Sequence, residues 1–375
     1  MRKVMTALAA MVLALGSGGL MAADQDTIKI GYGGALLGNL ASYGLSGFYG
    51  MEYAVLQANA KGGVLGKQIE IVKEDDGCDP AMATNAANKL ASGGIKVVNG
   101  HTCSGATRSA LSVYGDNVLL ISPSATEVSL TTDGAHPYFF RTTPRDDAQS
   151  ALEVQLLKKN GYKKVAILHD KGDYGQALAN LARAEIEADK ASGLEIVLFD
   201  GITTGQVSFD SVISRLKNSG AEALLWGGYY SDASKMVIQM RNKKLEVVVI
   251  GADGLKNDGY LKMAGAAAEG TYATGQVDLT SNPLAQAAVE DHKKRYPTEE
   301  IGPYFLYSAG ATEALLAAIE KAGGVSDLAA IKKHLHEDEV ETVMGPVRFD
   351  ERGDVIGAGF KMFVVKDGGY VEVEL

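Results

Sequence analysis

Apolar segments of strand length alternate with helical segments over most of this chain. The segments VAILH at 165–169 and VVVIG at 247–251 are nearly continuous apolar runs. Such runs are typical of strands that are buried on both faces of a parallel sheet. Because helical segments connect the successive strands, the pattern predicts an α/β fold in which helices cover both faces of each sheet.

The alternation occurs twice, on either side of a polar, turn-like stretch at 141–147. It therefore predicts two Rossmann-like lobes, each with a doubly wound parallel sheet. The expected strands are 27–33, 68–75, 95–100 and 118–122 in the first set, and 164–170, 194–201, 223–228 and 247–251 in the second. The expected helices are 43–60, 80–92, 105–115, 174–190, 209–219, 233–243, 282–296, 303–322 and 327–335. From residue 343 onwards the sequence predicts strands and turns.

The late helical block can complete a lobe that began earlier, so we expect a hinge with several crossovers. This interpretation divides the chain into 24–143 plus 277–348 for the N-terminal lobe and 144–276 plus 349–375 for the C-terminal lobe. The hinge segments are then expected near 141–145, 275–277 and 347–350.

The N-terminus has the three parts of a secretory signal peptide. Arg2 and Lys3 precede an uncharged apolar run at 4–15, and small residues lead to Ala23 before the first acidic residue, Asp24. The apolar run is shorter than the roughly 20 residues that span a bilayer. We therefore expect residues 1–23 to be removed on export, rather than to form a buried N-terminal helix. No cysteine stands at the cleavage site, so a lipid anchor is not expected.

The chain contains only two cysteines, Cys78 in DDGCDP and Cys103 in GHTCSG. An exported chain can keep disulfides, so the two cysteines are predicted to be joined. The alternative is a hydrolase with Cys103 as nucleophile and His101 as base, which requires a free thiol. The formal charge of −10 disfavours nucleic-acid binding. The histidine spacing indicates no metal site, and no phosphate-binding glycine motif is present, so no cofactor is expected.

Hydroxyl groups follow two of the predicted strands directly. Ser104 comes after strand 95–100, and Ser124 and Thr126 come after strand 118–122. In open α/β sheets ligands bind beyond the carboxyl ends of the strands, where free backbone N–H groups favour an anion. The pattern is consistent with a carboxylate site, although Ser and Thr at these positions are also common helix caps.

The second set of strands offers the complementary groups. Asp253 follows strand 247–251, and Tyr229 follows strand 223–228. A carboxylate that faces hydroxyl groups across a cleft suits a ligand with an ammonium group, and aromatic rings suit its apolar part. The Asp253–Gly254 pair is also a common turn, so by itself it is weak evidence.

Several sequence blocks, in order and spacing, resemble the branched-chain amino-acid (Leu/Ile/Val) binding proteins. These are type I periplasmic substrate-binding proteins of ABC importers. The blocks are NAKGGVLGKQIEIVKEDDGCDP, GHTCSGATR, ISPSAT, ILHDKGDYG, FDGIT, GGYY and ETVMGPVRFDERGD. The resemblance covers nearly all of the chain after the predicted signal peptide, and it implies a Venus-flytrap fold and the same disulfide.

The resemblance also implies roles for individual residues. Ser104 and Thr126 would bind an α-carboxylate, the Ser124 carbonyl would accept from an α-ammonium group, and Asp253 would be its counter-charge. The residues expected to contact a ligand are Tyr43, Thr102, Ser104, Ser124, Ala125, Thr126, Tyr174, Tyr229, Asp253 and Tyr304.

Three of these residues depart from the family pattern. Asp253 stands where Glu is usual, Tyr304 where Phe is usual, and Thr102 where an apolar residue is usual. The block GGYYSD also lacks the His-Pro that is usual after its first Tyr. Together these departures predict a pocket that is more polar than a leucine site requires.

The resemblance implies a periplasmic receptor that closes on one amino acid and delivers it to a membrane permease. We expect a monomer without catalytic activity. The alternative on the same fold is a sensory receptor that presents its ligand to a chemotaxis or signalling partner.

Overall fold

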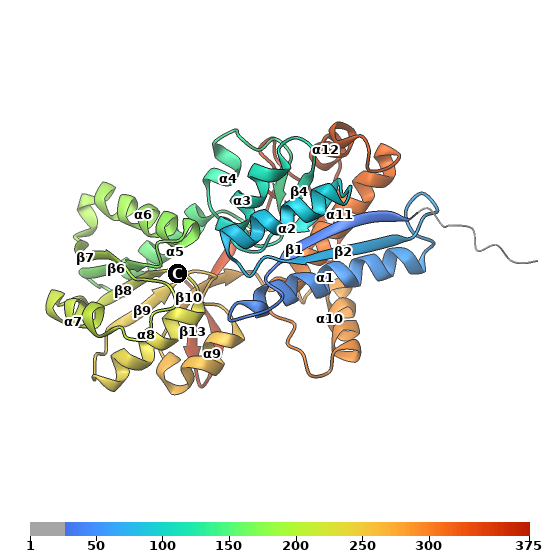
Figure 1. Cartoon of the computed structure of the whole chain (residues 1–375). Helices are drawn as coiled ribbons and strands as arrows, with labels where there is room; N and C mark the ends of the chain where they lie inside the picture. The colour runs from blue at the N-terminus through green and yellow to red at the C-terminus, as the bar shows by residue number, and fades with distance from the viewer. Residues whose placement is uncertain (1–26) are drawn as a thin grey trace, which may run out of the picture.

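The structure, a computed structural model, describes residues 27–375 (Figure 1). The predicted signal peptide, 1–23, lies outside the described residues. The chain forms two α/β lobes, each built on one sheet with helices on both faces (Figure 1). The two-lobed α/β architecture predicted from the strand pattern is therefore confirmed.

The first lobe is built on a five-stranded parallel sheet with the order β2-β1-β3-β4-β5. Its strands are β1 (Ile28–Gly34), β2 (Ile69–Asp75), β3 (Val97–Gly100), β4 (Leu119–Ser122) and β5 (Phe139–Arg141). The edge strand β5 was not predicted, because it is short and lies next to the polar stretch that indicated a turn.

Helices cover both faces of this sheet. On one face lie α1 (Ala41–Ala60), α11 (Phe305–Ala322) and α12 (Leu328–Glu337), and on the other α2 (Pro80–Ser92) and α3 (Ser104–Tyr114). Helix α2 has the predicted bounds, and Asp79 caps it, since its carboxylate accepts from the N–H groups of Ala81 and Met82. Near them lie α4 (Ser129–Thr132), α10 (Pro283–Arg295) and a hairpin of β11 (Val340–Thr342) and β12 (Gly345–Val347).

The second lobe is built on a seven-stranded sheet with the order β14-β13-β10-β9-β8-β6-β7. Its strands are β6 (Lys164–His169), β7 (Glu195–Gly201), β8 (Ala223–Gly227), β9 (Val248–Gly251), β10 (Tyr272–Gln276), β13 (Phe360–Lys366) and β14 (Gly369–Val373). Unlike the parallel sheet that we predicted, this one has an antiparallel edge at β13 and β14. Asp367 and Gly368 join these strands with positive φ angles of 53° and 74°, a tight connection that permits only antiparallel pairing.

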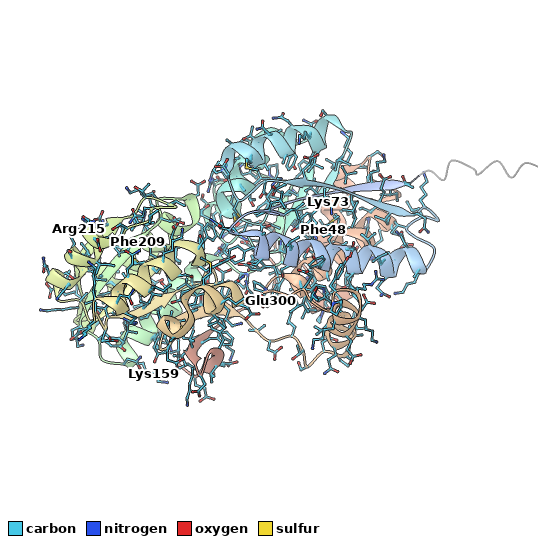
Figure 2. All side chains as sticks on the ribbon, turned by 60° about the horizontal axis from the view of Figure 1, so that its bottom comes forward. Phe48, Lys73, Lys159, Phe209, Arg215 and Glu300 are labelled. Carbon is cyan, nitrogen blue, oxygen red and sulfur yellow. A yellow bond between two sulfur atoms is a disulfide. The ribbon has the colours of Figure 1, made fainter. Side chains whose placement is uncertain are left out.

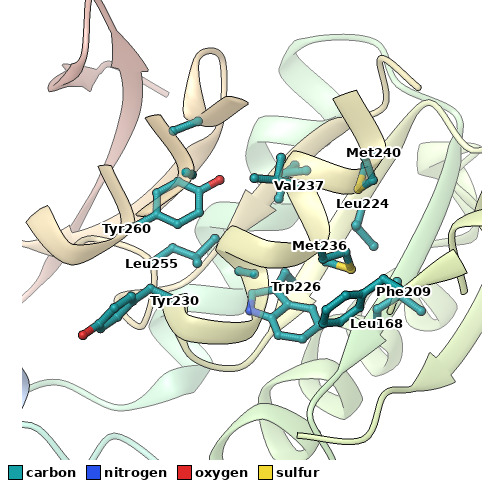
Figure 3. Packing of buried hydrophobic residues seen from close by; sticks show 14 of the residues in the cluster. Leu168, Phe209, Leu224, Trp226, Tyr230, Met236, Val237, Met240, Leu255 and Tyr260 are labelled. Atoms are coloured by element: carbon teal, nitrogen blue, oxygen red, sulfur yellow. The ribbon is translucent and has the colours of Figure 1, made fainter. Parts of the chain in front are cut away.

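Two helical layers enclose the second sheet. On one face lie α5 (Asp146–Lys159) and α6 (Asp173–Ala188), and on the other α7 (Asp210–Ser219), α8 (Tyr230–Asn242) and α9 (Asp258–Ala264). Short 3₁₀ turns lie at Lys190–Ser192 and Gly265–Ala268. Trp226 packs with Phe209, Met236 and Leu255 under α7 and α8, as expected for a core residue (Figure 3). Phe48 belongs to a core cluster of the first lobe and Phe209 to one of the second, and Figure 2 shows these two residues in their separate lobes.

Helices α5 and α9 and strand β10 were also missed by the sequence analysis. The buried positions in the first half of α5 are Asp146, Gln149, Ser150 and Glu153, so an apolar period is missing from this half of the helix. In β10 the polar residues Thr274 and Gln276 flank Gly275, and glycine is unfavourable in strands. These polar buried residues turn out to lie beside the site described next.

Candidate ligand-binding site

The carboxyl ends of the two sheets face each other across a small cavity. Its empty space, including the mouth, is about 240 Å³. It is lined by Tyr43, Thr102, Cys103, Ser104, Ser124, Thr126, Tyr174, Tyr229, Asp253, Gly254 and Tyr304. All the predicted contact residues except Ala125 are in this lining; Ala125 is instead fully buried in the core under α3.

On the first-lobe side, two loops after β3 and β4 bring the hydroxyl groups together. Ser104 is the first residue of α3 and does not cap it; its Oγ accepts from the N–H of Glu127, at 3.3 Å. The Ser124 hydroxyl donates to the Thr102 carbonyl over 2.8 Å. The loops are therefore tied to each other, and the Ser104 hydroxyl donates no side-chain hydrogen bond among residues 27–375.

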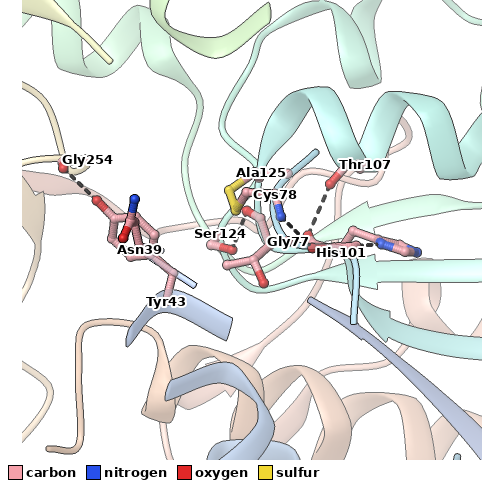
Figure 4. The surroundings of a disulfide bond; sticks show 12 residues. Asn39, Tyr43, Gly77, Cys78, His101, Thr107, Ser124, Ala125 and Gly254 are labelled. Atoms are coloured by element: carbon pink, nitrogen blue, oxygen red, sulfur yellow. Dashed lines mark hydrogen bonds and ion pairs between the residues drawn. A yellow bond between two sulfur atoms is a disulfide. The ribbon is translucent and has the colours of Figure 1, made fainter. Parts of the chain in front are cut away.

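The disulfide between Cys78 and Cys103 joins the loop after β2 to the loop after β3, as predicted (Figure 4). The alternative of a thiol nucleophile at Cys103 is wrong, because both cysteines are bonded. His101 is fully buried, with its Nδ1 at 2.7 Å from Asp76 and its Nε2 at 3.0 Å from the Tyr114 hydroxyl. This histidine therefore anchors the loop within the core.

On the second-lobe side, Asp253 follows β9 and is only 2% exposed. Its Oδ1 accepts from Gln149 at 3.1 Å and from the Tyr174 hydroxyl at 2.9 Å. Its Oδ2 accepts from Gln276 at 3.2 Å and from the Tyr304 hydroxyl at 3.1 Å. A carboxylate offers about four acceptor positions, so these donors occupy all of them. Burial raises the pKa of Asp253 above its usual value, although all four donors favour the ionised form.

Gln149 and Gln276 were not among the residues predicted from the sequence. Gln149 comes from α5 and Gln276 from the end of β10, the two elements that the sequence analysis missed. One signal was present: polar residues recur at 146, 149, 150 and 153, which is a single helical face. A polar stretch of a helix can be buried against a site, as the first half of α5 is here.

Four tyrosines form the walls of the cavity. The rings of Tyr174 and Tyr229 stack with centroids 5.2 Å apart, and Tyr43 lies 5.9 Å from Tyr229 and 5.7 Å from Tyr304. Burial raises the pKa of all four phenols well above 10. The hydroxyl groups therefore stay protonated and can act as hydrogen-bond donors, while the rings offer apolar surface.

The two lobes touch directly around the cavity. The Tyr43 hydroxyl of α1 donates to the Gly254 carbonyl across the lobes, at 2.6 Å (Figure 4). The bond from Tyr304 to Asp253 crosses in the same way. At the rim, the ion pairs Arg108–Asp173 and Lys262–Glu300 join the lobes at 3.0 Å and 2.6 Å. The structure therefore shows a closed arrangement.

These groups suit a small zwitterion: hydroxyl donors on one side, a carboxylate on the other, and aromatic rings between them. Among residues 27–375, no group of three or more His, Cys, Asp or Glu side chains is arranged to hold a metal ion. No helix in this part of the chain is long and apolar enough to cross a membrane.

A family model described as "Periplasmic binding protein" matches residues 27–369. The chain belongs to the periplasmic binding protein family. As a member of this family it is a substrate-binding protein, which confirms the resemblance seen in the sequence blocks. The Leu/Ile/Val-binding protein of Escherichia coli K12 is 36% identical over 345 residues, which cover 92% of each chain. The leucine-specific-binding protein of Salmonella typhimurium is 36% identical over 366 residues, 96% of each chain.

Solved structures of periplasmic binding proteins have the same fold. The branched-chain amino acid binding protein LivJ of Streptococcus pneumoniae, in complex with isoleucine, is 27% identical, with a TM-score of 0.80 over 92% of this chain and all of that one. The leucine binding protein LivK of Thermotoga maritima has a TM-score of 0.83 at 22% identity over 93% of this chain and 98% of that one, a likeness of fold alone.

Proposed function

We propose that this periplasmic binding protein captures one amino acid between its lobes and delivers it to the membrane permease of an ABC importer. The observation that carries the proposal is the composition of the cavity. Two hydroxyl-bearing loops from one lobe face a buried carboxylate from the other, at the carboxyl ends of both sheets. Relatives that share 36% of their residues with this chain are named for leucine, isoleucine and valine.

The proposed ligand pose follows from the donors and acceptors in the cavity. The Ser104 and Thr126 hydroxyl groups donate to the α-carboxylate, and the Ser104 oxygen keeps its bond from Glu127. The Ser124 carbonyl and the Asp253 carboxylate take the α-ammonium group. Because the acceptor positions of Asp253 are filled in the closed arrangement, the ammonium group would share or displace the longest of the four bonds, which comes from Gln276 at 3.2 Å.

The lobe boundaries proposed from the sequence are 24–143 plus 277–348 and 144–276 plus 349–375. The sheet assignments support them, since β1 to β5 form one sheet, and β6 to β10 with β13 and β14 form the other. Opening would then be a rotation about segments near 141–145, 275–277 and 347–350. Since one chain supplies both sides of the cavity, we propose that a monomer suffices for binding.

The proposed location is the periplasm, reached by cleavage of residues 1–23 and without a lipid anchor. The Cys78–Cys103 disulfide supports an oxidising compartment. We propose that the protein acts by binding alone, with no covalent chemistry.

A screen of ligands tests the proposal. The protein would be unfolded and refolded to remove any carried-over ligand, and its melting temperature measured with each of the common amino acids. A ligand at 100 times its dissociation constant stabilises the folded state by about 2.7 kcal/mol. One or a few amino acids should raise the melting temperature, and the polar side chains of the cavity make threonine-like ligands worth including. If no amino acid shifts the melting temperature, the proposed function is wrong.

A further inference from the structure

Gln149 lies directly behind Asp253, and its side chain makes four hydrogen bonds. It is fully buried on the polar face of α5. Its Nε2 donates to Asp253 at 3.1 Å and to Asp146 at 2.8 Å. Its Oε1 accepts from the backbone N–H of Asp253 at 2.9 Å and from the Thr274 hydroxyl. One side chain therefore holds both the backbone and the carboxylate of Asp253.

The position of Gln149 is itself fixed. Further along the same buried face of α5, Val154 and Leu157 are buried in the core beneath the second sheet. The helix cannot shift without opening that core, so the amide of Gln149 is a rigid support. It does not line the cavity. Any effect it has on a ligand must therefore act through Asp253.

We infer that Gln149 is a positioning residue, which aims the Asp253 carboxylate at the ammonium group of the ligand. This inference rests on the proposed function. An amide meets the requirement and a hydroxyl does not, because the site needs two donated and two accepted hydrogen bonds with no added charge. Leucine at this position would leave the buried Asp253 N–H without its acceptor and remove one donor from the carboxylate.

The first experiment compares an amino acid with its desamino analogue, the same carboxylic acid without the amino group. The amino acid is the one found to bind the wild type. Wild-type protein should prefer the amino acid strongly, because only the amino acid has an ammonium group for Asp253. In Gln149→Leu this preference should fall about 10- to 100-fold, by the value of a hydrogen bond to a charged group. A change in general stability would weaken both ligands equally and leave the ratio unchanged.

Gln239→Leu is the matched control. Gln239 is a half-buried glutamine of α8 in the same lobe, and it bonds the Phe209 N–H at 2.8 Å and the Val207 carbonyl at 2.9 Å. It lines no part of the cavity. The control should lose stability and keep the wild-type ratio of affinities.

Gln149→Glu provides a second readout, through pH. The introduced carboxyl would face Asp146 on its own helix, Asp253 after β9, and the neutral Thr274 of β10. Tyr174, Tyr304, Glu153 and the more distant Arg141 complete the titratable or charged surroundings. Ionised, the introduced group can only accept and repels both aspartates; protonated, it regains a donor. The affinity of Gln149→Glu for the amino acid, relative to that of wild type at the same pH, should therefore recover as pH falls from about 8 to about 5.

The outcomes separate the two ideas. If wild type binds no amino acid, the proposed function fails and the inference fails with it. If wild type binds an amino acid, and folded Gln149→Leu keeps its preference for that amino acid over the desamino analogue within threefold of wild type, only the inference is overturned. If Gln149→Leu does not fold, the pH profile of Gln149→Glu decides. An affinity that recovers relative to wild type as pH falls supports the positioning role, and a relative affinity that does not change with pH overturns it.

Discussion

The hydrogen bond from Tyr304 to Asp253 is a direct link between the lobes, and its contribution to closure can be measured. Tyr304 precedes α11 in the first lobe, and its hydroxyl lies 3.1 Å from Oδ2 of Asp253 in the second. Tyr174 makes the equivalent bond to Oδ1 over 2.9 Å, but from within the second lobe. Opening the cleft therefore breaks the Tyr304 bond and leaves the Tyr174 bond intact.

The expected size of the effect follows from the partners. A hydrogen bond to a charged group contributes about 1.5–3 kcal/mol net of solvent exchange. Because this bond exists only in the closed arrangement, Tyr304→Phe should lower the closing equilibrium constant roughly 10- to 150-fold. The ring of Tyr304 stays in contact with that of Tyr43, so the substitution removes the hydroxyl and little else.

The assay measures the separation of the lobes, by small-angle scattering or by a pair of labels, in ligand-free and saturated protein. Tyr304→Phe should have a larger open population without ligand. If the ligand-free wild type is already open, the same factor should appear as a weaker ligand affinity, since binding requires closure. Tyr174→Phe, which removes a bond to the same carboxylate, should leave the ligand-free open population as in wild type.

Two results would refute this reasoning. The first is a Tyr304→Phe protein whose open population and affinity both stay within threefold of wild type. The second is an equal shift in Tyr174→Phe, which would show that the carboxylate environment, rather than the link between lobes, controls closure.

Three further predictions concern charge, the disulfide and pH. Asp253→Asn should weaken ligand binding by about 2–5 kcal/mol in calorimetry, and a loss below threefold would contradict its role as charge partner. Cys103→Ser, which removes the bridge to Cys78 across 25 positions, should lower the free energy of unfolding by roughly 3–4 kcal/mol in urea titrations; unchanged midpoints would argue otherwise. Burial raises the pKa of Glu153 well above its usual value, so its stabilising contribution is present at low pH and lost as pH rises through the raised pKa. Glu153→Gln should therefore raise the melting temperature at pH 8 and not at low pH. The exposed control Glu290→Gln should show no such dependence on pH, and equal shifts of Glu153→Gln at both pH values would exclude this explanation.

A helix or strand could be predicted from the sequence where its own residues form a recognisable pattern. Helix α2 was predicted with its correct ends, because Asp79 and Pro80 form a local start signal. Helix α5 was missed, since its buried face presents Asp146 and Gln149 where a core helix would present apolar residues. An apolar sequence pattern indicates a helix that is buried against an apolar core. It cannot indicate a helix that is buried against a polar site.

For the site, the sequence alone placed hydroxyl groups and Asp253 at the carboxyl ends of strands, because that position follows from the order of strands and turns along the chain. It also limited any disulfide to the Cys78–Cys103 pair, since only two cysteines exist. Only the tertiary structure decided which donors hold Asp253: Gln149 lies 104 positions away in the sequence, and Tyr304 lies 51 positions away in the other lobe. A hydrogen bond requires its donor and acceptor atoms to lie about 3 Å apart. This separation depends on how α5 packs on its sheet and how the two lobes pack together, which no local pattern encodes.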